Sequence, residues 1–233
     1  MNIAIIPARG GSKRIPRKNI KSFHGKPMIA WSIEAAKQSG LFDQIVVSTD
    51  DDEIALIAKA YGAEVPFERP AVLADDHTPT VPVIAQAIAV LAEQGVSPDL
   101  VCCIYPCAPF LHSEDLVAGL KLLHESRANF VYPVAEFAHP VQRALLRAKN
   151  GQMQFLSPEH ELTRTQDIPR TFHDVGQFYW GRVGAWVAQK RMHSEGAGLV
   201  IPHWRVVDID TAEDWTRAEL LYHLLAERKD RSL

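Results

Sequence analysis

Residues 2–19 read NIAIIPARGGSKRIPRKN, and this stretch indicates both a fold and the place of a site. Asn2–Pro7 is a short apolar run of the kind that forms a strand buried on both faces of a parallel sheet. Two adjacent glycines follow the run, with basic residues around them. Parallel α/β sheets bind their ligands beyond the carboxyl ends of the strands. The sequence therefore predicts a ligand-binding loop directly after the first strand.

Charge is distributed unevenly along the chain. The 233 residues carry a net charge of −3, yet residues 1–33 hold seven basic side chains and no acidic one, which leaves −10 for the remainder (−3 minus +7). The seven are Arg9, Lys13, Arg14, Arg17, Lys18, Lys21 and Lys26. A concentrated positive patch on an acidic protein favours one small polyanion, and it argues against a general nucleic-acid surface.

The loop 8–19 suits a polyphosphate. Gly10 and Gly11 let backbone N–H groups approach phosphate oxygens closely. Side chains of the loop that can make hydroxyl or charge-assisted contacts with phosphate are Arg9, Ser12, Lys13 and Lys18. The alternative is a solvated basic loop, which the paired glycines after a strand make the weaker interpretation. A Walker loop is excluded because Gly25-Lys26 is followed by Pro27, and the three spaced glycines of a dinucleotide loop are missing.

The chain alternates strand-like and helix-like segments, which predicts an α/β fold with a mostly parallel sheet and helices on both faces. The expected strands are 2–7, 44–49, 63–66, 99–105, 129–134, 177–182, 199–201 and 204–209. The expected helices are 27–38, 50–61, 81–94, 113–125 and 211–227. The alternation stops between about 135 and 175, where no strong period is present. We expect a core of residues 1–134 and 176–233, with 135–175 as an inserted arm.

A second motif is Asp208-Ile209-Asp210-Thr211. On a strand, residues two apart point to the same face, so both carboxylates would converge. Paired carboxylates suit Mg²⁺, which keeps several waters and also binds phosphates. The alternative is that Asp210 belongs to the N-cap of the last helix.

Cellular context follows from what the sequence contains. No apolar run approaches the roughly 20 residues of a membrane span, and the N-terminus does not resemble a signal peptide. Cys102, Cys103 and Cys107 are odd in number and lie in one apolar segment. That pattern favours reduced thiols over a disulfide framework. We expect a cytoplasmic protein without membrane or nucleic-acid partners.

Ile6–Asn19 resembles the opening motif of the CMP-sialic acid synthetase family of cytidylyltransferases. The resemblance continues in order along nearly the whole chain, through 45–51, 69–76, 105–109, 176–179 and 208–211. Segments 64–80, 105–110 and 176–181 are most similar to pseudaminic acid cytidylyltransferases. Two positions depart from N-acetylneuraminate synthetases: Tyr105 stands where they have Gln, and His173 where they have a basic residue of the arm.

The resemblance implies a Rossmann-like nucleotidyltransferase core with a dimerisation arm, forming a homodimer. It implies transfer of CMP from CTP to the anomeric hydroxyl of a nine-carbon acidic sugar with Mg²⁺ as cofactor. The implied CTP-binding residues are Ala8, Arg9, Gly10, Gly11, Ser12, Lys13, Lys18, Asn19, Arg69, Asp76 and Thr80. The implied catalytic residues are Arg9, Lys18, Asp208 and Asp210, the last two holding the metal. The implied sugar-binding residues are Tyr105, Gln177, Phe178, Tyr179, Arg164 and Arg170, the two arginines acting across the dimer.

Pseudaminic acid is the expected sugar. The alternatives are N-acetylneuraminate, legionaminate and 3-deoxy-octulosonate in the same reaction. Rivals of another class are a nucleotide binder without catalysis and a glycosyltransferase that uses Asp208 and Asp210 as its metal motif. The intact carboxylate pair argues against the first rival, and the basic loop after the first strand argues against the second.

Overall fold

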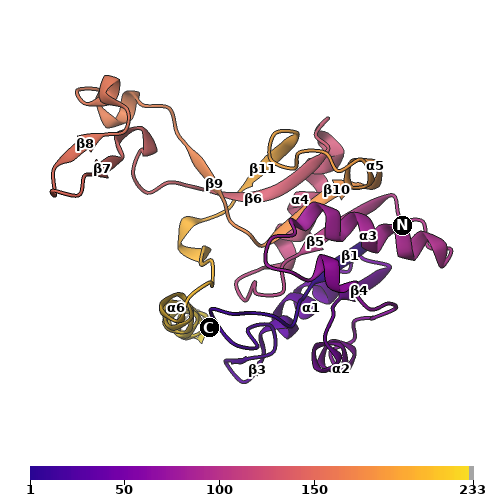
Figure 1. The fold of residues 1–233 in the computed structure, drawn as a ribbon. Helices are drawn as coiled ribbons and strands as arrows, with labels where there is room; N and C mark the ends of the chain where they lie inside the picture. The colour runs from indigo at the N-terminus through magenta and orange to yellow at the C-terminus, as the bar shows by residue number, and fades with distance from the viewer. Residues whose placement is uncertain (231–233) are drawn as a thin grey trace.

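The computed structural model describes residues 1–230, which form a mixed sheet between helices and a projecting arm (Figure 1). The strand order in the main sheet is β11-β6-β10-β5-β1-β4, and β9 pairs with β6. These strands are β1 Asn2–Pro7, β4 Gln44–Ser48, β5 Leu100–Ile104, β6 Phe130–Glu136, β9 Phe172–Asp174, β10 Phe178–Arg182 and β11 Gly196–Val200. Two small hairpins consist of β2 Ser22–Phe23 with β3 Lys26–Pro27, and β7 Leu145–Arg147 with β8 Met153–Phe155.

Strand β1 lies inside the sheet, as its apolar sequence predicted. It pairs in parallel with β4 on one side and β5 on the other, so that Ile5 lies opposite both Val46 and Cys103. Strand β10 then enters between β5 and β6 in the antiparallel sense. The prediction of an α/β fold with a parallel core is confirmed, and the antiparallel β10 is an addition that the alternation of elements did not reveal.

Helices cover both faces of this sheet because its strands are apolar on both sides. The α-helices are α1 Met28–Ser39, α2 Asp52–Ala60, α3 Thr80–Glu93, α4 Ser113–Glu125, α5 Val183–Val187 and α6 Ala212–Asp230. On one face Ile6 packs in a cluster with residues of α1, α2 and α4, and on the other Ile5 packs with residues of α3 and α5. Gly40 is left-handed (φ 65°) and ends α1, and Asp51 caps α2 by accepting from Ile54 N, so that α2 begins two residues later than expected.

The arm leaves the sheet at the end of β6 and returns through β9, and Figure 1 shows it projecting away from the core. Its β7–β8 hairpin exposes apolar side chains, among them Leu145 and Met153. The pairing of Glu136 with Phe172 extends the main sheet into the segment expected to be arm. Short 3₁₀ turns η2 Val141–Arg143, η3 Pro158–His160 and η4 Thr165–Asp167 complete it, as η1 Ala71–Leu73 and η5 His203–Arg205 do elsewhere.

The expected strand over 204–209 is wrong. The chain makes the short turn η5 there and then runs extended to α6 without sheet pairing. Side chains still alternate, because Val207 and Ile209 are buried in a cluster with Trp215 of α6 while Asp208 is exposed. The alternation of buried and exposed side chains therefore indicates an extended segment with one face against the core, and it does not require pairing with another strand.

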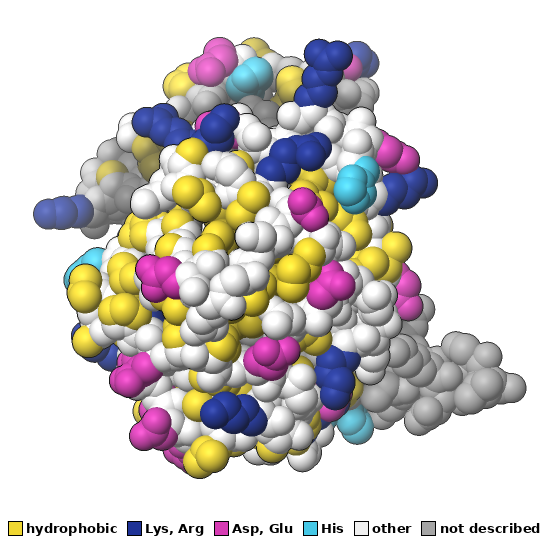
Figure 2. All heavy atoms as spheres, turned by 90° about the vertical axis from the view of Figure 1, so that its right-hand side faces the viewer, with side chains coloured by type: hydrophobic (Ala, Val, Ile, Leu, Met, Phe, Trp, Pro, Cys, Tyr) yellow, Lys and Arg dark blue, Asp and Glu magenta, His cyan; other side chains and the backbone are white. Residues whose placement is uncertain are grey.

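The surface carries mixed charges on the face shown in Figure 2, where Lys and Arg side chains lie scattered among acidic and apolar ones. Among residues 1–230, none of the helices combines the length and apolar character required to cross a membrane.

Candidate active site

The loop after β1 packs closely against the turn that follows β4. Gly10 N donates to Asp50 Oδ1 at 3.0 Å, and a Cβ on Gly10 would lie 2.7 Å from Asp51 Oδ2. Any larger residue at position 10 would have to displace that carboxylate. The N–H of Gly10 is thus occupied within the protein, and the glycine serves close packing of two loops rather than direct approach to a phosphate.

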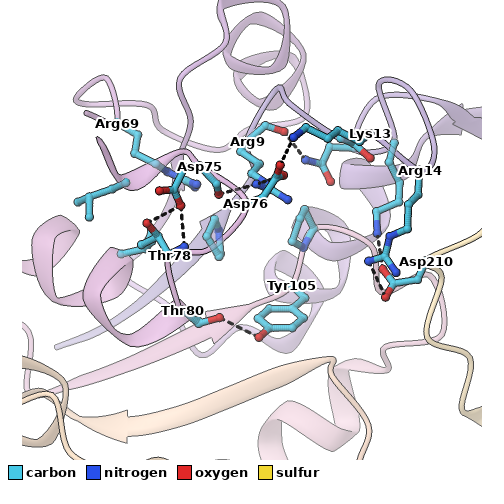
Figure 3. A pocket seen from close by; sticks show the side chains of 17 residues that line it. Arg9, Lys13, Arg14, Arg69, Asp75, Asp76, Thr78, Thr80, Tyr105 and Asp210 are labelled. Atoms are coloured by element: carbon cyan, nitrogen blue, oxygen red, sulfur yellow. Dashed lines mark hydrogen bonds and ion pairs between the residues drawn. The ribbon is translucent and has the colours of Figure 1, made fainter. Parts of the chain in front are cut away.

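A cavity of about 530 Å³ opens at the carboxyl ends of β1 and β5, within the size range of small-molecule sites (Figure 3). Its polar walls come from the basic loop, the loop before α3, the end of β5 and the segment before α6. It is lined by Pro7, Arg9, Ser12, Lys13, Arg14, Lys18, Asn19, Arg69, Leu73, Asp75, Asp76, Thr78, Thr80, Val83, Tyr105, Pro106 and Asp210. The topology thus gathers predicted residues from four separate segments.

Two cations of the basic loop are paired with the facing loop. Arg9 lies 2.8 Å from Asp76 and also donates to the carbonyl of Asp75, and Lys13 pairs with Asp76 as well. The hydrogen bond from Lys13, with the charges of both cations, holds the pKa of Asp76 below its ordinary value. Asp75 shapes this loop by accepting from the N–H and hydroxyl of Thr78. Asp76 therefore acts at the cavity as the partner of two cations of the basic loop.

Lys18 connects the basic loop to the acidic motif. Its Nζ donates to the carbonyl of Ile209 at 2.7 Å and to Asp210 Oδ1 at 3.3 Å. Arg14 binds the other oxygen of Asp210 at 2.9 Å. Residues almost two hundred positions apart in the sequence thereby meet at one wall of the cavity.

The two carboxylates of the acidic motif lie on the solvent side of their extended segment, because Val207 and Ile209 point into the core. Desolvation by the protein next to Asp208 raises its pKa, and the negative charge of Asp210 raises it further. Neighbouring carboxylates whose repulsion is only partly relieved are suited to a divalent cation. Within residues 1–230 the site supplies two such groups and lacks a cluster of three or more His, Cys, Asp or Glu. That number fits Mg²⁺, which takes its remaining ligands from water and phosphate.

The helix-cap alternative for Asp210 is resolved by the neighbouring residues. Thr211 Oγ1 accepts from Asp214 N at 3.2 Å, and Asp214 Oδ2 accepts from Thr211 N at 2.8 Å. This reciprocal pair caps α6. The carboxylate of Asp210 is left to the cations of the basic loop.

Arg69 is a buried cation in the cavity wall, with 4% of its surface exposed. Its Nε donates to Ser48 Oγ at 3.1 Å, and its Nη2 donates to the carbonyl of Ser48. Burial lowers the pKa of Arg69 to about 10, against the attraction of Asp50. Among the described residues it forms no ion pair with a carboxylate within 4.0 Å, so a positive charge faces the cavity without a close counter-charge.

Two hydroxyl groups form another wall. Tyr105 OH and Thr80 Oγ1 lie 2.8 Å apart and both line the cavity, on the side opposite Arg9 and Lys13 in Figure 3. Burial raises the pKa of Tyr105 to about 12, so the hydroxyl keeps its proton at neutral pH. This wall can offer both donors and acceptors without charge.

Some residues expected at the site lie outside the cavity lining. Ala8, Gly10 and Gly11 belong to the loop that supports it, and Asp208 lies beside Asp210. Gln177 is buried, where its carbonyl accepts from Tyr105 N at 2.8 Å. Phe178 faces α4 in the core, since side chains alternate along β10 and only Tyr179 points to the Tyr105 side. In the arm, Arg164 pairs with Asp167 and Arg170 with Glu136, both away from the cavity of their own chain.

The sequence profile of the cytidylyltransferase family matches residues 3–200. The chain belongs to the cytidylyltransferase family. This cytidylyltransferase is 41% identical over 222 residues to the pseudaminic acid cytidylyltransferase of Campylobacter jejuni serotype O:2, covering 95% of this chain and 96% of that protein. It is 31% identical over 231 residues to the CMP-N,N'-diacetyllegionaminic acid synthase of Legionella pneumophila, covering 97% of both.

A solved structure shares the fold of this cytidylyltransferase. CMP:2-keto-3-deoxy-manno-octonic acid synthetase complexed with CTP superposes with a TM-score of 0.68 at 18% identity, over 96% of this chain and 98% of that one. The expected nucleotidyltransferase fold is thereby confirmed, and so is the resemblance to the sialic-acid-activating branch.

Seven residues of the cavity lining are not among the site residues expected from the sequence: Pro7, Arg14, Leu73, Asp75, Thr78, Val83 and Pro106. Arg14 was recognised only as part of the basic patch. Its alternation with Ser12, both facing the cavity, is a signal that could have found it. Leu73 and Val83 are apolar residues of a loop and a helix, and nothing in their local sequence distinguishes them from core positions.

Proposed function

We propose that this cytidylyltransferase transfers CMP from CTP to the anomeric hydroxyl of pseudaminic acid, giving CMP-pseudaminic acid and pyrophosphate. The observation that carries the proposal is a cavity that combines a cluster of basic side chains, Asp210 of the carboxylate pair and a neutral hydroxyl wall. The similarity to the Campylobacter protein over 95% of the chain supports the choice of sugar. The Legionella relative makes a legionaminate the first alternative.

Arg9, Lys13 and Lys18 would bind the triphosphate, each by charge-assisted hydrogen bonds. Their present partners Asp76 and Asp210 hold them in place and would yield to a more highly charged ligand. Arg69, buried without a close counter-charge, would bind an acceptor of the nucleotide. Ser12 and Asn19 line the cavity between these groups.

Asp208 and Asp210 would hold Mg²⁺. The ion would neutralise negative charge on the phosphates, which lets two anionic substrates approach each other. The protein's own contribution is to orient the substrates and to stabilise charge on the leaving pyrophosphate with Arg9 and Lys18. The anomeric oxygen forms a bond to the α-phosphorus while the bond from that phosphorus to the pyrophosphate oxygen breaks, and the hydroxyl proton passes to solvent.

The arm supports a homodimeric assembly. It exposes Leu145, Leu146 and Met153 on a hairpin that projects from the core, and such apolar surface is typical of an interface. In a dimer Arg164 or Arg170 would reach the sugar carboxylate of the partner's site. We place the enzyme in the cytoplasm, where CTP is available.

The test is pyrophosphate release from CTP and Mg²⁺ with pseudaminic acid, N-acetylneuraminate, a legionaminate or 3-deoxy-octulosonate supplied separately. Turnover with pseudaminic acid at the highest kcat/KM is the expected result, and turnover of another sugar with none on pseudaminic acid would overturn the proposed specificity. Asp210→Asn should retain CTP binding and lose turnover. Unchanged turnover in that variant would remove Asp210 from the reaction.

A further inference from the structure

A row of polar groups continues behind the hydroxyl wall of the cavity. Tyr105 OH lies 2.8 Å from Thr80 Oγ1, and the ring of Tyr179 lies 5.2 Å from the ring of Tyr105. Tyr179 is 2% exposed and donates its hydroxyl proton to Asp174 Oδ2 at 2.7 Å. The row therefore leads from the cavity to a carboxylate that is absent from the cavity lining.

Three donors fix the carboxylate of Asp174. Its Oδ1 accepts from Gly176 N at 2.9 Å, and its Oδ2 accepts from Tyr179 OH and from His193 Nε2 at 2.8 Å. Gly176 is in the left-handed region (φ 68°), and a Cβ there would lie 4.0 Å from the ring of Tyr105. The turn that brings the backbone N–H to Asp174 is thus the same turn that lies against Tyr105.

His193 is itself held from outside the row. Its carbonyl accepts from Tyr132 OH at 3.2 Å, and its ring lies 5.1 Å from that of Tyr132 in an edge-on contact. The ring of Tyr132 lies 6.0 Å from Tyr179. Tyr132 therefore packs beside Tyr179 through its ring, while its hydroxyl bonds to the His193 carbonyl rather than to Asp174, Tyr179 or Tyr105.

The chemistry of these groups determines which of them donates each hydrogen bond in the row. An ionised carboxylate only accepts, so Tyr179 must donate to Asp174, and its oxygen lone pairs remain for the side facing Tyr105. Burial raises the pKa of both tyrosines, with the nearby Asp174 adding to the effect, so both hydroxyls stay protonated. Asp174 thereby constrains how Tyr179 is oriented, and the ring of Tyr179, 5.2 Å from that of Tyr105, constrains where the Tyr105 hydroxyl can lie.

We propose that Asp174 is a positioning residue that acts through Tyr179 to orient the Tyr105 hydroxyl toward the acceptor sugar. This inference rests on the proposed function, because it takes the Tyr105 wall as the side that receives the sugar. Arg9 and Lys13, two of the side chains that would bind triphosphate, lie across the cavity from that wall (Figure 3). Loss of Asp174 should therefore affect the sugar and spare CTP.

The experiment compares Asp174→Asn, Tyr179→Phe and the double variant in steady-state kinetics, on a sugar that the wild-type enzyme converts. We expect each single variant to raise the KM for the sugar about fivefold, the effect of one misaligned hydrogen bond, while the KM for CTP stays within twofold. The double variant should be no worse than Asp174→Asn alone, because both changes interrupt one route. Asp174→Glu, which keeps the acceptor charge, should recover part of the loss.

Tyr132→Phe is the matched control, since it removes a neighbouring hydroxyl outside the route and should leave both KM values unchanged. Multiplicative effects in the double variant, or an equal loss of CTP and sugar binding, would overturn the proposal. If Asp174→Asn fails to fold in a thermal unfolding assay, Tyr179→Phe alone decides, because an unchanged sugar KM there breaks the route. Absence of wild-type turnover on pseudaminic acid would instead count against the proposed function, and the variants would then be compared on the sugar that is converted.

Discussion

Replacing Arg69 with methionine should weaken the binding of CTP while leaving the stability of the fold nearly unchanged. Burial lowers the pKa of Arg69 to about 10, more than two units below the ordinary value of an arginine. A tenfold change in acidity corresponds to about 1.4 kcal/mol, so the fold disfavours the charged guanidinium by roughly 3 kcal/mol. Its two hydrogen bonds to Ser48 offset a similar amount, at about 1.5–3 kcal/mol for each bond to a charged group.

Methionine keeps much of the buried side-chain volume of Arg69 and removes the charge. The two terms nearly cancel, so we expect the free energy of unfolding to change by less than about 2 kcal/mol. The affinity for CTP, measured by isothermal titration calorimetry, should fall roughly 10- to 100-fold as one charge-assisted contact is lost. Thermal unfolding of the same samples reports the stability.

Arg205 provides the matched control. It is buried to a similar degree, at 7% exposed, but forms a two-bond ion pair with Asp115 at 2.6 and 3.0 Å. Arg205→Met leaves that carboxylate without its partner and should cost about 3–5 kcal/mol while sparing CTP affinity. The reasoning would be refuted if Arg69→Met proved strongly destabilised yet bound CTP as the wild type does, because Arg69 would then serve the fold alone.

Three further outcomes follow from the structure. Asp76→Asn frees two cations from ion pairs at the rim of the cavity, so calorimetry should show CTP binding up to about fivefold tighter. Weaker binding would mean that Asp76 contacts the nucleotide. Gly181→Ala would place a Cβ 2.4 Å from Trp186 Nε1, so the free energy of unfolding measured in urea should fall by about 1–3 kcal/mol. Gly184→Ala is the control, because open space surrounds that position and stability should not change. Equal effects of the two substitutions would contradict the packing argument. Iodoacetamide at pH 8 should leave the cysteines of the native protein unlabelled, because burial raises the pKa of Cys107 to about 12 and also raises the pKa of Cys102 and Cys103. Mass spectrometry of native and urea-treated samples measures the labelling, and labelling of the native protein at the rate of the unfolded protein would contradict the expectation.

Much of the core could be predicted because local sequence and tertiary role agree there. Asn2–Pro7 is apolar throughout and forms β1 with the predicted bounds, since a strand buried on both faces needs no alternation. The helix predicted over 27–38 forms as α1 Met28–Ser39, and it ends before Gly40, which adopts the left-handed conformation (φ 65°). The basic loop could be predicted for the same reason, because the glycine pair and the buried strand before it are adjacent in the sequence.

Other features depend on partners that are distant in the sequence. The antiparallel direction of β10 is set by its neighbours β5 and β6, and its own residues carry no sign of it. The pairing of Asp76 with Arg9 and Lys13 joins two loops far apart in sequence, and nothing in the local sequence of either loop indicates it. Phe178 was assigned to the sugar through its motif, although the side-chain period of two along β10 turns it into the core.

The two ends of the arm are neighbours in the sheet. Glu136 pairs with Phe172, and the backbone N–H of Phe137 donates to the carbonyl of Thr171 at 3.1 Å. The arm is topologically a long loop that joins the two antiparallel strands β6 and β9 of a hairpin. A short turn such as Asn-Gly could connect the same two strands in its place. A shortened chain of this kind would fold without its projection. It would offer a compact scaffold into which a different hairpin, or an unrelated small domain, could be grafted beside the catalytic cavity.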